Sequence, residues 1–329
     1  MTKHDVLALL RQADVPLSGQ RIAQTLQISR TAVWKAVEAL RREGYQIASQ
    51  PHRGYCLTGT PDRLSEEEIQ NHLGGHPWQD RVIVLDSVDS TNSFAKQLAA
   101  SGAPEGTAVL ARSQQKGRGR LGRSFSSPSD VGIYLSVILR PDAKPEQLLH
   151  LTAAAAEAAA EAIEAQTGLN TGIKWVNDLT AGGKKLAGIL TELSVELESG
   201  RSEYIVVGIG VNCCQSPEDF PPELTEIATS VYEQTGRLPD RNALAAEMLL
   251  ALSRLSETLL TEKEDWMRRY AARCITVGRQ VRVISPRETR EGTALGLDAN
   301  GALQVAYSDG TQVWVSSGEV SVRGLYGYL

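Results

Sequence analysis

The sequence of 329 residues predicts a multidomain α/β protein with a small helical head, a central α+β domain and a small β-barrel of SH3-like type at the end. Three observations predict this division. Residues 1–62 hold three short helical patterns and then two strand patterns, residues 63–273 mix buried strand patterns with long helical ones, and residues 274–329 hold short strand patterns with tight turns. A chain of this length is expected to form two or three domains of about 100–200 residues each.

The composition is that of a globular protein and argues against several other classes. Hydrophobic residues make up 42% of the chain and charged residues 22%. No apolar run approaches the ~20 residues that a membrane helix needs, and the first residues do not resemble a signal peptide. The four cysteines show no C-x-x-C spacing, so neither a metal site nor a disulfide framework is predicted, and the cytoplasm is the expected compartment.

The charge is unevenly distributed along the chain. Residues 1–60 carry eight Lys or Arg against four Asp or Glu, a net charge of +4, so the whole-chain charge of −5 leaves −9 for the remainder. A basic head on an acidic body indicates that only the head meets a polyanion.

The order of elements in the head is typical of a winged helix-turn-helix domain. Ser18 and Ser29 can each cap a helix, over residues 19 to about 26 and 30 to about 43. A β-hairpin with a basic tip is expected over residues 45–57, as the wing.

In this interpretation the second helix of the motif binds DNA. The side chains expected to face the major groove are Arg30, Thr31, Trp34 and Lys35, and those expected to touch backbone phosphates are Arg53 and His52. The alternative is a helical packing module that touches no nucleic acid. The local charge of +4 and the basic wing tip favour DNA binding.

The densest functional signal is the stretch 116–123, which holds four fixed positive charges and three glycines in eight residues. Guanidinium groups bind phosphate or carboxylate oxygens in pairs, and glycines let the backbone close over a ligand. Gly117, Gly119 and Gly122 also fit a dinucleotide fingerprint, but residues 124–130 are typical of a loop and not of the helix which that fingerprint requires. Apolar runs on both sides place the stretch inside a sheet, which favours an anion-binding loop over a merely solvated one.

Two further polar clusters lie beside strand patterns. Ser90, Thr91 and Asn92 open a helix, and because one cap needs one side chain, the others could bind the polar head of a ligand. Residues 173–179 combine a cation, an indole, an amide and a carboxylate. Lys185 follows a Gly-Gly turn, where its ammonium could reach a ligand, although a lysine at a hairpin start is usually only solvated.

Four motifs, in this order, resemble those of biotin protein ligases, specifically the bifunctional bacterial form that is also the biotin operon repressor. They are Asp89-Ser90-Thr91-Asn92, Gly117-Arg118-Gly119-Arg120-Leu121-Gly122-Arg123, Lys174-Trp175-Val176-Asn177-Asp178 and Lys185-Leu186-Ala187-Gly188-Ile189-Leu190. Each motif is weak alone, but their joint order and spacing are specific, and the resemblance covers nearly the whole chain. It implies a central domain of the class II synthetase-like biotin/lipoate ligase type, with domains at 1–62, 63–273 and 274–329.

The resemblance also implies an activity. ATP and biotin would form biotinyl-5′-AMP with release of pyrophosphate, and the biotinyl group would pass to a lysine of a carboxyl carrier domain, as in acetyl-CoA carboxylase. Mg²⁺ would neutralise the departing pyrophosphate. The adenylate would act as corepressor by favouring a homodimer on operator DNA.

Site residues follow from the same resemblance. Those expected to bind biotin are Ser90, Thr91, Asn92, Gln114, Arg118, Gly119, Arg120 and Lys185. Those expected on the nucleotide side are Gly117, Arg120, Arg123, Phe125, Asn177 and Asn212. Lys185, Arg118 and Arg120 are the expected catalytic cations, because attack of a carboxylate on a phosphate must overcome the repulsion between two anions.

Three residues depart from the pattern of the family, and two rival functions stay open. Leu121 stands where an arginine is common, Phe125 where some relatives carry tryptophan, and Val176 where proline is common. The rivals are a lipoate ligase, which does similar acyl-adenylate chemistry, and a transcription factor that senses biotin or its adenylate without catalysis.

Overall fold

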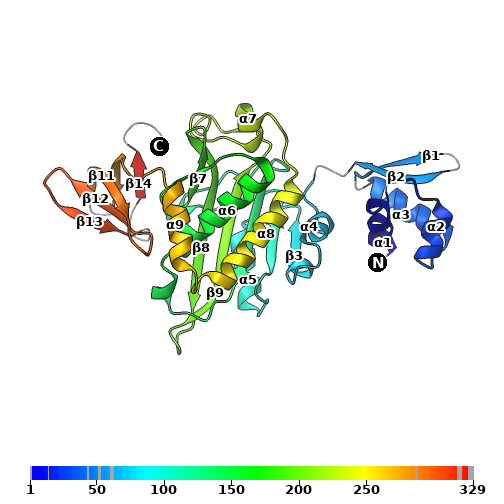
Figure 1. The fold of residues 1–329 in the computed structure, drawn as a ribbon, viewed down its shortest axis with the longest axis horizontal. Coiled ribbons are helices and arrows are strands. Elements are labelled where there is room, and N and C mark those ends of the chain that lie inside the picture. Colours follow the sequence, from blue (N-terminus) through cyan, green and yellow to red (C-terminus); the bar gives the residue numbers. More distant parts are fainter. Residues whose placement is uncertain are drawn as a thin grey trace. The chain divides into compact units, whose positions relative to one another are not determined.

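The computed structural model describes residues 2–13, 15–42, 44–50, 53–59, 63–285, 288–316 and 321–324. By its internal contacts the chain divides into two compact units, Met1–Arg63 and Leu64–Leu329. Figure 1 shows their elements in chain order from blue to red. The wing residue His52 and residues 60–62, at the predicted end of the first domain, lie outside the described residues.

The first unit has the predicted winged helix-turn-helix order. Its elements are α1 (Thr2–Arg11), α2 (Gly19–Thr25), α3 (Arg30–Arg42) and the antiparallel strands β1 (Gln46–Gln50) and β2 (Gly54–Gly59). Both predicted caps are present: Ser18 Oγ accepts from Arg21 N at 3.1 Å and Ser29 Oγ from Ala32 N at 3.1 Å. The unit has its own hydrophobic core, in which Val6, Ile22 and Val37 are fully buried.

The second unit is built on a seven-stranded sheet. The strand order is β3-β4-β5-β9-β8-β7-β6, with β3 and β4 parallel and every other neighbouring pair antiparallel. The strands are β3 (Val82–Leu85), β4 (Ala108–Ala111), β5 (Gly132–Leu139), β6 (Gly172–Lys174), β7 (Asp178–Ala181), β8 (Lys184–Val195) and β9 (Ser202–Asn212). The basic stretch at 116–123 joins β4 to β5, so it interrupts a sheet as predicted.

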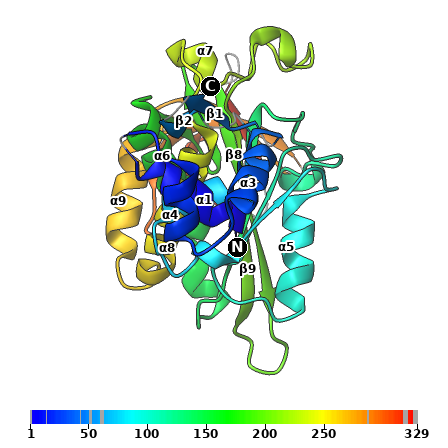
Figure 2. The same ribbon diagram turned by 90° about the vertical axis from the view of Figure 1, so that its right-hand side faces the viewer.

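Helices cover both faces of this sheet. Figure 2 shows α5 on one side of the strands and α6, α8 and α9 on the other. The helices are α4 (Glu66–Leu73), α5 (Thr91–Ala100), α6 (Leu151–Thr167), α7 (Val231–Thr235), α8 (Arg241–Thr258) and α9 (Lys263–Arg273), and the short 3₁₀ turns are η1 (Gln79–Arg81), η2 (Arg120–Gly122), η3 (Pro145–Leu148) and η4 (Pro217–Asp219). All the alanines of α6 except Ala165 are buried in the main core, because small side chains let the helix lie close to its neighbours.

The C-terminal domain is an antiparallel sheet of five strands, in the order β13-β12-β11-β10-β14. The strands are β10 (Gln280–Ile284), β11 (Thr289–Leu297), β12 (Leu303–Tyr307), β13 (Gln312–Val315) and β14 (Ser321–Gly324). Gly301 and Gly310, in the two predicted turns, have φ of 80° and 84°, a left-handed conformation that glycine adopts without strain.

This C-terminal sheet is joined to the central domain at one of the predicted motifs. Trp175 donates from its backbone N to Thr276 Oγ1 at 2.8 Å and from its indole Nε1 to Gly301 O at 2.8 Å. Ile275 N also donates to Ile173 O at 2.9 Å. The start of the C-terminal domain therefore fixes the turn between β6 and β7.

None of the helices that the structure describes combines the length and the apolar character that a membrane crossing requires.

Candidate active site

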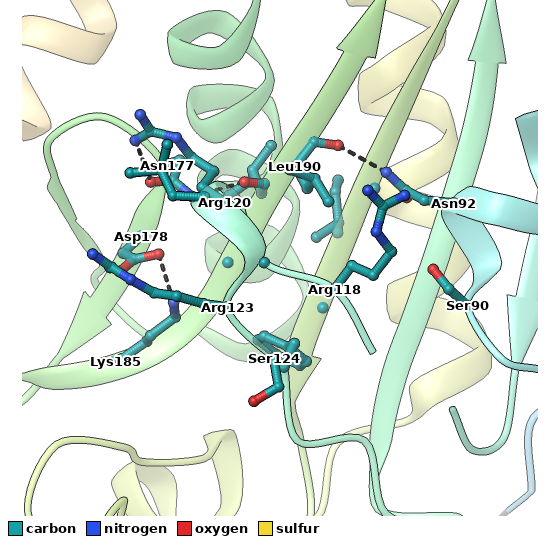
Figure 3. Close-up of a pocket in the computed structure, with 18 of the residues that line it drawn as sticks. Ser90, Asn92, Arg118, Arg120, Arg123, Ser124, Asn177, Asp178, Lys185 and Leu190 are labelled. Atoms are coloured by element: carbon teal, nitrogen blue, oxygen red, sulfur yellow. Dashed lines mark hydrogen bonds and ion pairs between the residues drawn. The ribbon is translucent and has the colours of Figure 1, made fainter. Parts of the chain in front are cut away.

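The predicted motifs converge on one cavity of about 590 Å³ in the second unit. Figure 3 shows its walls: the basic loop after β4, the start of α5, the turn between β6 and β7, and strands β8 and β9. Six described cationic side chains line it, namely Arg118, Arg120, Arg123, Lys174, Lys185 and Arg282. Asp178 is the one carboxylate among the described lining residues. Such a cavity favours anionic ligands.

Glycines in β9 make room for side chains that lie over the sheet. A Cβ on Gly208 would come within 2.0 Å of Asn92 Oδ1, and one on Gly210 within 2.5 Å of the Phe125 ring. A glycine inside a buried strand often marks the close approach of a ligand or of another backbone. In the structure the nearest groups are side chains, and these in turn form the walls of the cavity.

The Ser90-Thr91-Asn92 motif is buried, and its side chains make contacts other than a helix cap. Ser90 occupies the N-cap position of α5, but its side chain makes no capping hydrogen bond. Thr91 donates from its backbone N to Gln114 Oε1 at 2.9 Å, and Gln114 Nε2 donates to Ser127 Oγ at 2.8 Å. These bonds tie the start of α5 to the segment that carries the basic loop.

The basic loop folds back on itself as a tight hairpin. Gly119 N donates to Arg123 O at 2.7 Å, and Arg118 and Ser124 form an isolated antiparallel bridge. Gly117 has no room for a side chain, because a Cβ would lie 2.2 Å from Phe125 O. Leu121 adopts φ 54°, a left-handed conformation that is unfavourable for leucine. No helix follows the loop, which confirms that it is not a dinucleotide-binding turn.

Three of the predicted cations are held by partners within the protein. Lys185 Nζ lies 2.6 Å from Asp178 Oδ1, Arg120 donates from NH1 to Asn177 Oδ1 at 3.2 Å, and Arg118 donates from NH1 to Glu192 at 3.2 Å. The first two pairs appear as dashed lines in Figure 3. Burial, together with the charge of Arg123, lowers the pKa of Arg120, while the carboxylate of Asp178 acts in the opposite direction. The guanidinium is nevertheless charged at neutral pH.

The structure brings eleven of the thirteen predicted ligand-binding residues to this cavity. They are Ser90, Thr91, Asn92, Gln114, Arg118, Gly119, Arg120, Arg123, Phe125, Asn177 and Lys185. Gly117 is buried beneath the loop and is not among the residues that line the cavity. Asn212 lines a neighbouring cavity of about 80 Å³, whose wall also includes Phe125 and Lys185.

Comparisons with known proteins match this architecture along the chain. The Biotin/lipoate A/B protein ligase family matches residues 84–212, an HTH domain residues 2–56, and the Biotin protein ligase C terminal domain residues 276–323. The Bifunctional ligase/repressor BirA of Bacillus subtilis (strain 168) is 38% identical over 94% of this chain and 95% of its own length. The chain belongs to the biotin protein ligase family.

Two further relatives support the assignment to this family. The Bifunctional ligase/repressor BirA of Escherichia coli (strain K12) is 30% identical over 97% of this chain and 96% of its own length. Among solved structures, biotin protein ligase from Aquifex aeolicus in complex with biotin and ATP is similar, with a TM-score of 0.63 and 31% identity over 74% of this chain and 98% of that one. The sequence-based assignment of fold and family is therefore confirmed.

The residues predicted to meet DNA are exposed on one face of the first unit of this biotin protein ligase. Arg30, Thr31, Trp34 and Lys35 lie on the outer face of α3, and Trp34 is 53% exposed. The opposite face of α3 is buried in the core. Arg53 is exposed at the start of β2. This is the geometry that a recognition helix requires, and DNA contact by these residues stays a prediction.

Sequence reasoning missed two polar residues beside the cavity. Ser136 is fully buried in β5 and bonds both Thr91 and Asn92, at 2.8 and 2.6 Å between side-chain oxygens. Glu192, on β8, accepts hydrogen bonds from three side chains. A serine within the apolar run of β5 was the available signal for Ser136.

Proposed function

We propose that this protein activates biotin with ATP to biotinyl-5′-AMP and transfers the biotinyl group to a lysine of a carboxyl carrier domain. In the first step a carboxylate oxygen of biotin attacks the α-phosphorus of ATP, the bond to the β-phosphate breaks and pyrophosphate leaves. In the second step the lysine amine attacks the carbonyl of the mixed anhydride, an amide forms, and AMP leaves with loss of the amine proton. The observation that carries the proposal is the cavity, whose described lining residues include six cations and one carboxylate.

The arrangement of the cations suits the first step. Two anions must approach each other, and fixed positive charges lower the cost of that approach. Lys185, on β8, and Arg118 and Arg120, on the basic loop, line the cavity, so their charges are in place before the ligands arrive. We assign these three residues to the carboxylate and the α-phosphate.

The remaining predicted roles divide between the two ligands. Biotin would contact Ser90, Thr91, Asn92, Gln114 and Gly119, together with the three cations. The nucleotide would contact Gly117, Arg123, Phe125, Asn177 and Asn212, with the Phe125 ring available to stack on adenine. The hairpin of the basic loop would cover the mixed anhydride and exclude water from it.

The residues also fit a magnesium ion that arrives with ATP. Among the described residues no cluster of three His, Cys, Asp or Glu could hold a metal by itself. Mg²⁺ is usually held by one or two carboxylates together with substrate phosphates. Asp178 is the residue that would hold it, and the ion would neutralise charge on the pyrophosphate.

We further propose that the winged helix makes this ligase a repressor of biotin biosynthesis or transport genes. Exposed α3 residues and the name of the relatives, bifunctional ligase/repressor, support this second function. The adenylate would favour a homodimer whose two winged helices bind operator half-sites. The same proposal includes domain boundaries at 1–62, 63–273 and 274–329. It also includes a cytoplasmic location, which suits four cysteines that form no disulfide.

Exchange of labelled pyrophosphate into ATP tests the first step and separates the rivals. We expect exchange that depends on biotin, because adenylate formation is reversible while the intermediate stays bound. Lipoate should support less than about a hundredth of that rate. Faster exchange with lipoate would reassign the substrate. Tight binding of biotin without any exchange would instead favour a sensor that lacks catalysis.

A further inference from the structure

Glu192 lies beside the cavity and accepts hydrogen bonds from three side chains, two on α5 and one on the basic loop. Its Oε2 accepts from Asn92 Nδ2 at 3.0 Å, and its Oε1 accepts from Lys96 Nζ at 3.0 Å. Arg118 NH1 lies 3.2 Å from Oε1 and 3.4 Å from Oε2. The carboxylate on β8 is thus bonded to two side chains of α5 and to the first arginine of the basic loop.

This carboxylate is held in its charged form. Burial acts to raise the pKa of Glu192, since its side chain is only 19% exposed. Hydrogen bonds from Asn92 and Lys96, and the charges of Lys96 and Arg118, outweigh burial and keep its pKa below the ordinary value. At neutral pH the group is therefore a fixed negative charge that does not itself line the cavity.

Glu192 determines how the Asn92 amide is oriented. Asn92 Oδ1 lies 2.6 Å from Ser136 Oγ, while Nδ2 lies 3.3 Å from Leu190 O and 3.0 Å from Glu192. A carbonyl and a carboxylate only accept, so the NH₂ group of Asn92 must face β8 and its oxygen must face Ser136. Figure 3 shows the bond from Asn92 to Leu190.

Glu192 also directs the guanidinium of Arg118. That group is planar with five N–H donors in a fixed arrangement, so holding NH1 against both carboxylate oxygens limits the directions in which the other donors can point. Arg118 lines the cavity while its NH1 is bonded to Glu192 outside it. Its side chain is 46% exposed, and an ion pair so exposed adds little to folding stability. The orientation of Arg118 is therefore the main consequence of the pair.

We propose that Glu192 is a positioning residue of the ligase, which sets the Arg118 guanidinium and the Asn92 amide for the biotin half of the cavity. The inference rests on the proposed function, because it concerns how the same cavity holds biotin. Glu192 touches neither substrate, and it acts through these two residues.

The substitution Glu192→Gln tests this role with little change of size. Its amide oxygen can still accept from Asn92, but its NH₂ group then faces the N–H donors of Arg118, which repels them. We expect the KM for biotin in pyrophosphate exchange to rise about tenfold, with kcat and the KM for ATP changed less than about twofold. A merely structural role would instead lower the melting temperature and leave the KM for biotin unchanged.

The substitution Lys96→Met is the matched control. Lys96 bonds to the same carboxylate but is not among the residues that line the cavity. We expect its KM for biotin to stay within about twofold of wild type. An equal rise in both variants would show that charge balance around Glu192 matters, and not the direction of Arg118, and would overturn the proposal.

A double-mutant cycle shows whether Glu192 acts through Arg118. In an Arg118→Gln background, Glu192→Gln should raise the KM for biotin by no more than about threefold. This smaller rise is the part of the effect that acts through Asn92. A full tenfold rise in that background, or no rise in the wild-type background, would contradict the inference. If wild-type protein catalyses no exchange, the proposed function fails by itself, and direct titration of biotin on the same variants still decides the role of Glu192.

Discussion

Arg120 is the loop arginine most enclosed by the protein, since Arg118 and Arg123 are exposed and Arg120 is half-buried. Its bond to Asn177 joins the basic loop to the turn between β6 and β7. An arginine in this place can bridge a ligand phosphate and the protein, because its donors are spread across a plane. Removing it should therefore loosen the adenylate more than it changes the fold.

For Arg120→Gly we expect the bound adenylate to escape about tenfold to a hundredfold faster, since a hydrogen bond to a charged group contributes about 1.5–3 kcal/mol. The measurement is the release of labelled adenylate from protein freed of excess ligand. Release at the wild-type rate would show that Arg120 does not hold the adenylate.

At the scale of single residues, the sequence predicts which charged side chains belong to the site, but not which side chains bond to one another. The cations of the basic loop and Lys185 stand in recognisable motifs, and all but Lys116 line the cavity. Glu192 could not be predicted, because its partner Asn92 is 100 residues away in the chain and only the folded sheet brings the two together.

Helices and strands that carry a local signal in the sequence, such as a cap or an apolar run, lie where the sequence predicts them. Helices α2 and α3 begin directly after their predicted caps. Strands β3, β10 and β13 span 82–85, 280–284 and 312–315, which are the residues that the strand patterns in the sequence predict. The five residues of α7 were not predicted, because so short a segment carries less than two turns of a helix. The four residues of β14 were not predicted either, because Val322 is the one apolar side chain among them and no alternating pattern marks a strand.

The recognition helix α3 permits a separate test of the second function. Lys35→Ala should weaken binding to promoter DNA of biotin biosynthesis genes at least about tenfold. Arg53→Ala should reduce the slope of the log binding constant against log salt concentration by about one, because one phosphate contact is lost. Electrophoretic mobility with biotin and ATP present measures both. Transfer of biotin should be unchanged, because these residues belong to the other compact unit.

Arg237→Ala is the control for that experiment, since Arg237 is an exposed arginine of the second unit. Equal loss of DNA binding in this variant would show that net charge alone, and not α3, governs the interaction.

At the scale of the molecule, the sequence predicts three domains, whereas the contacts separate two compact units. The physical reason is the set of bonds from Ile173 and Trp175 to Thr276, Ile275 and Gly301, which join the C-terminal sheet to the central domain. Such bonds between distant segments leave no signature in composition or periodicity. The order of the domains, by contrast, follows from the patterns along the chain and is confirmed by the three family matches.

Transfer of biotin to a purified carrier domain, with ATP and Mg²⁺ present, tests the central claim most directly. Wild-type protein is compared with Lys185→Ala and with the control Lys184→Ala. The side chain of Lys184 bonds to Thr225 O, and Lys184 is not among the residues that line the cavity. We expect transfer that requires ATP, falls at least about a hundredfold in Lys185→Ala and stays within a few-fold in Lys184→Ala. Absence of transfer by wild-type protein that still binds biotin, or equal rates in the two variants, would contradict the account.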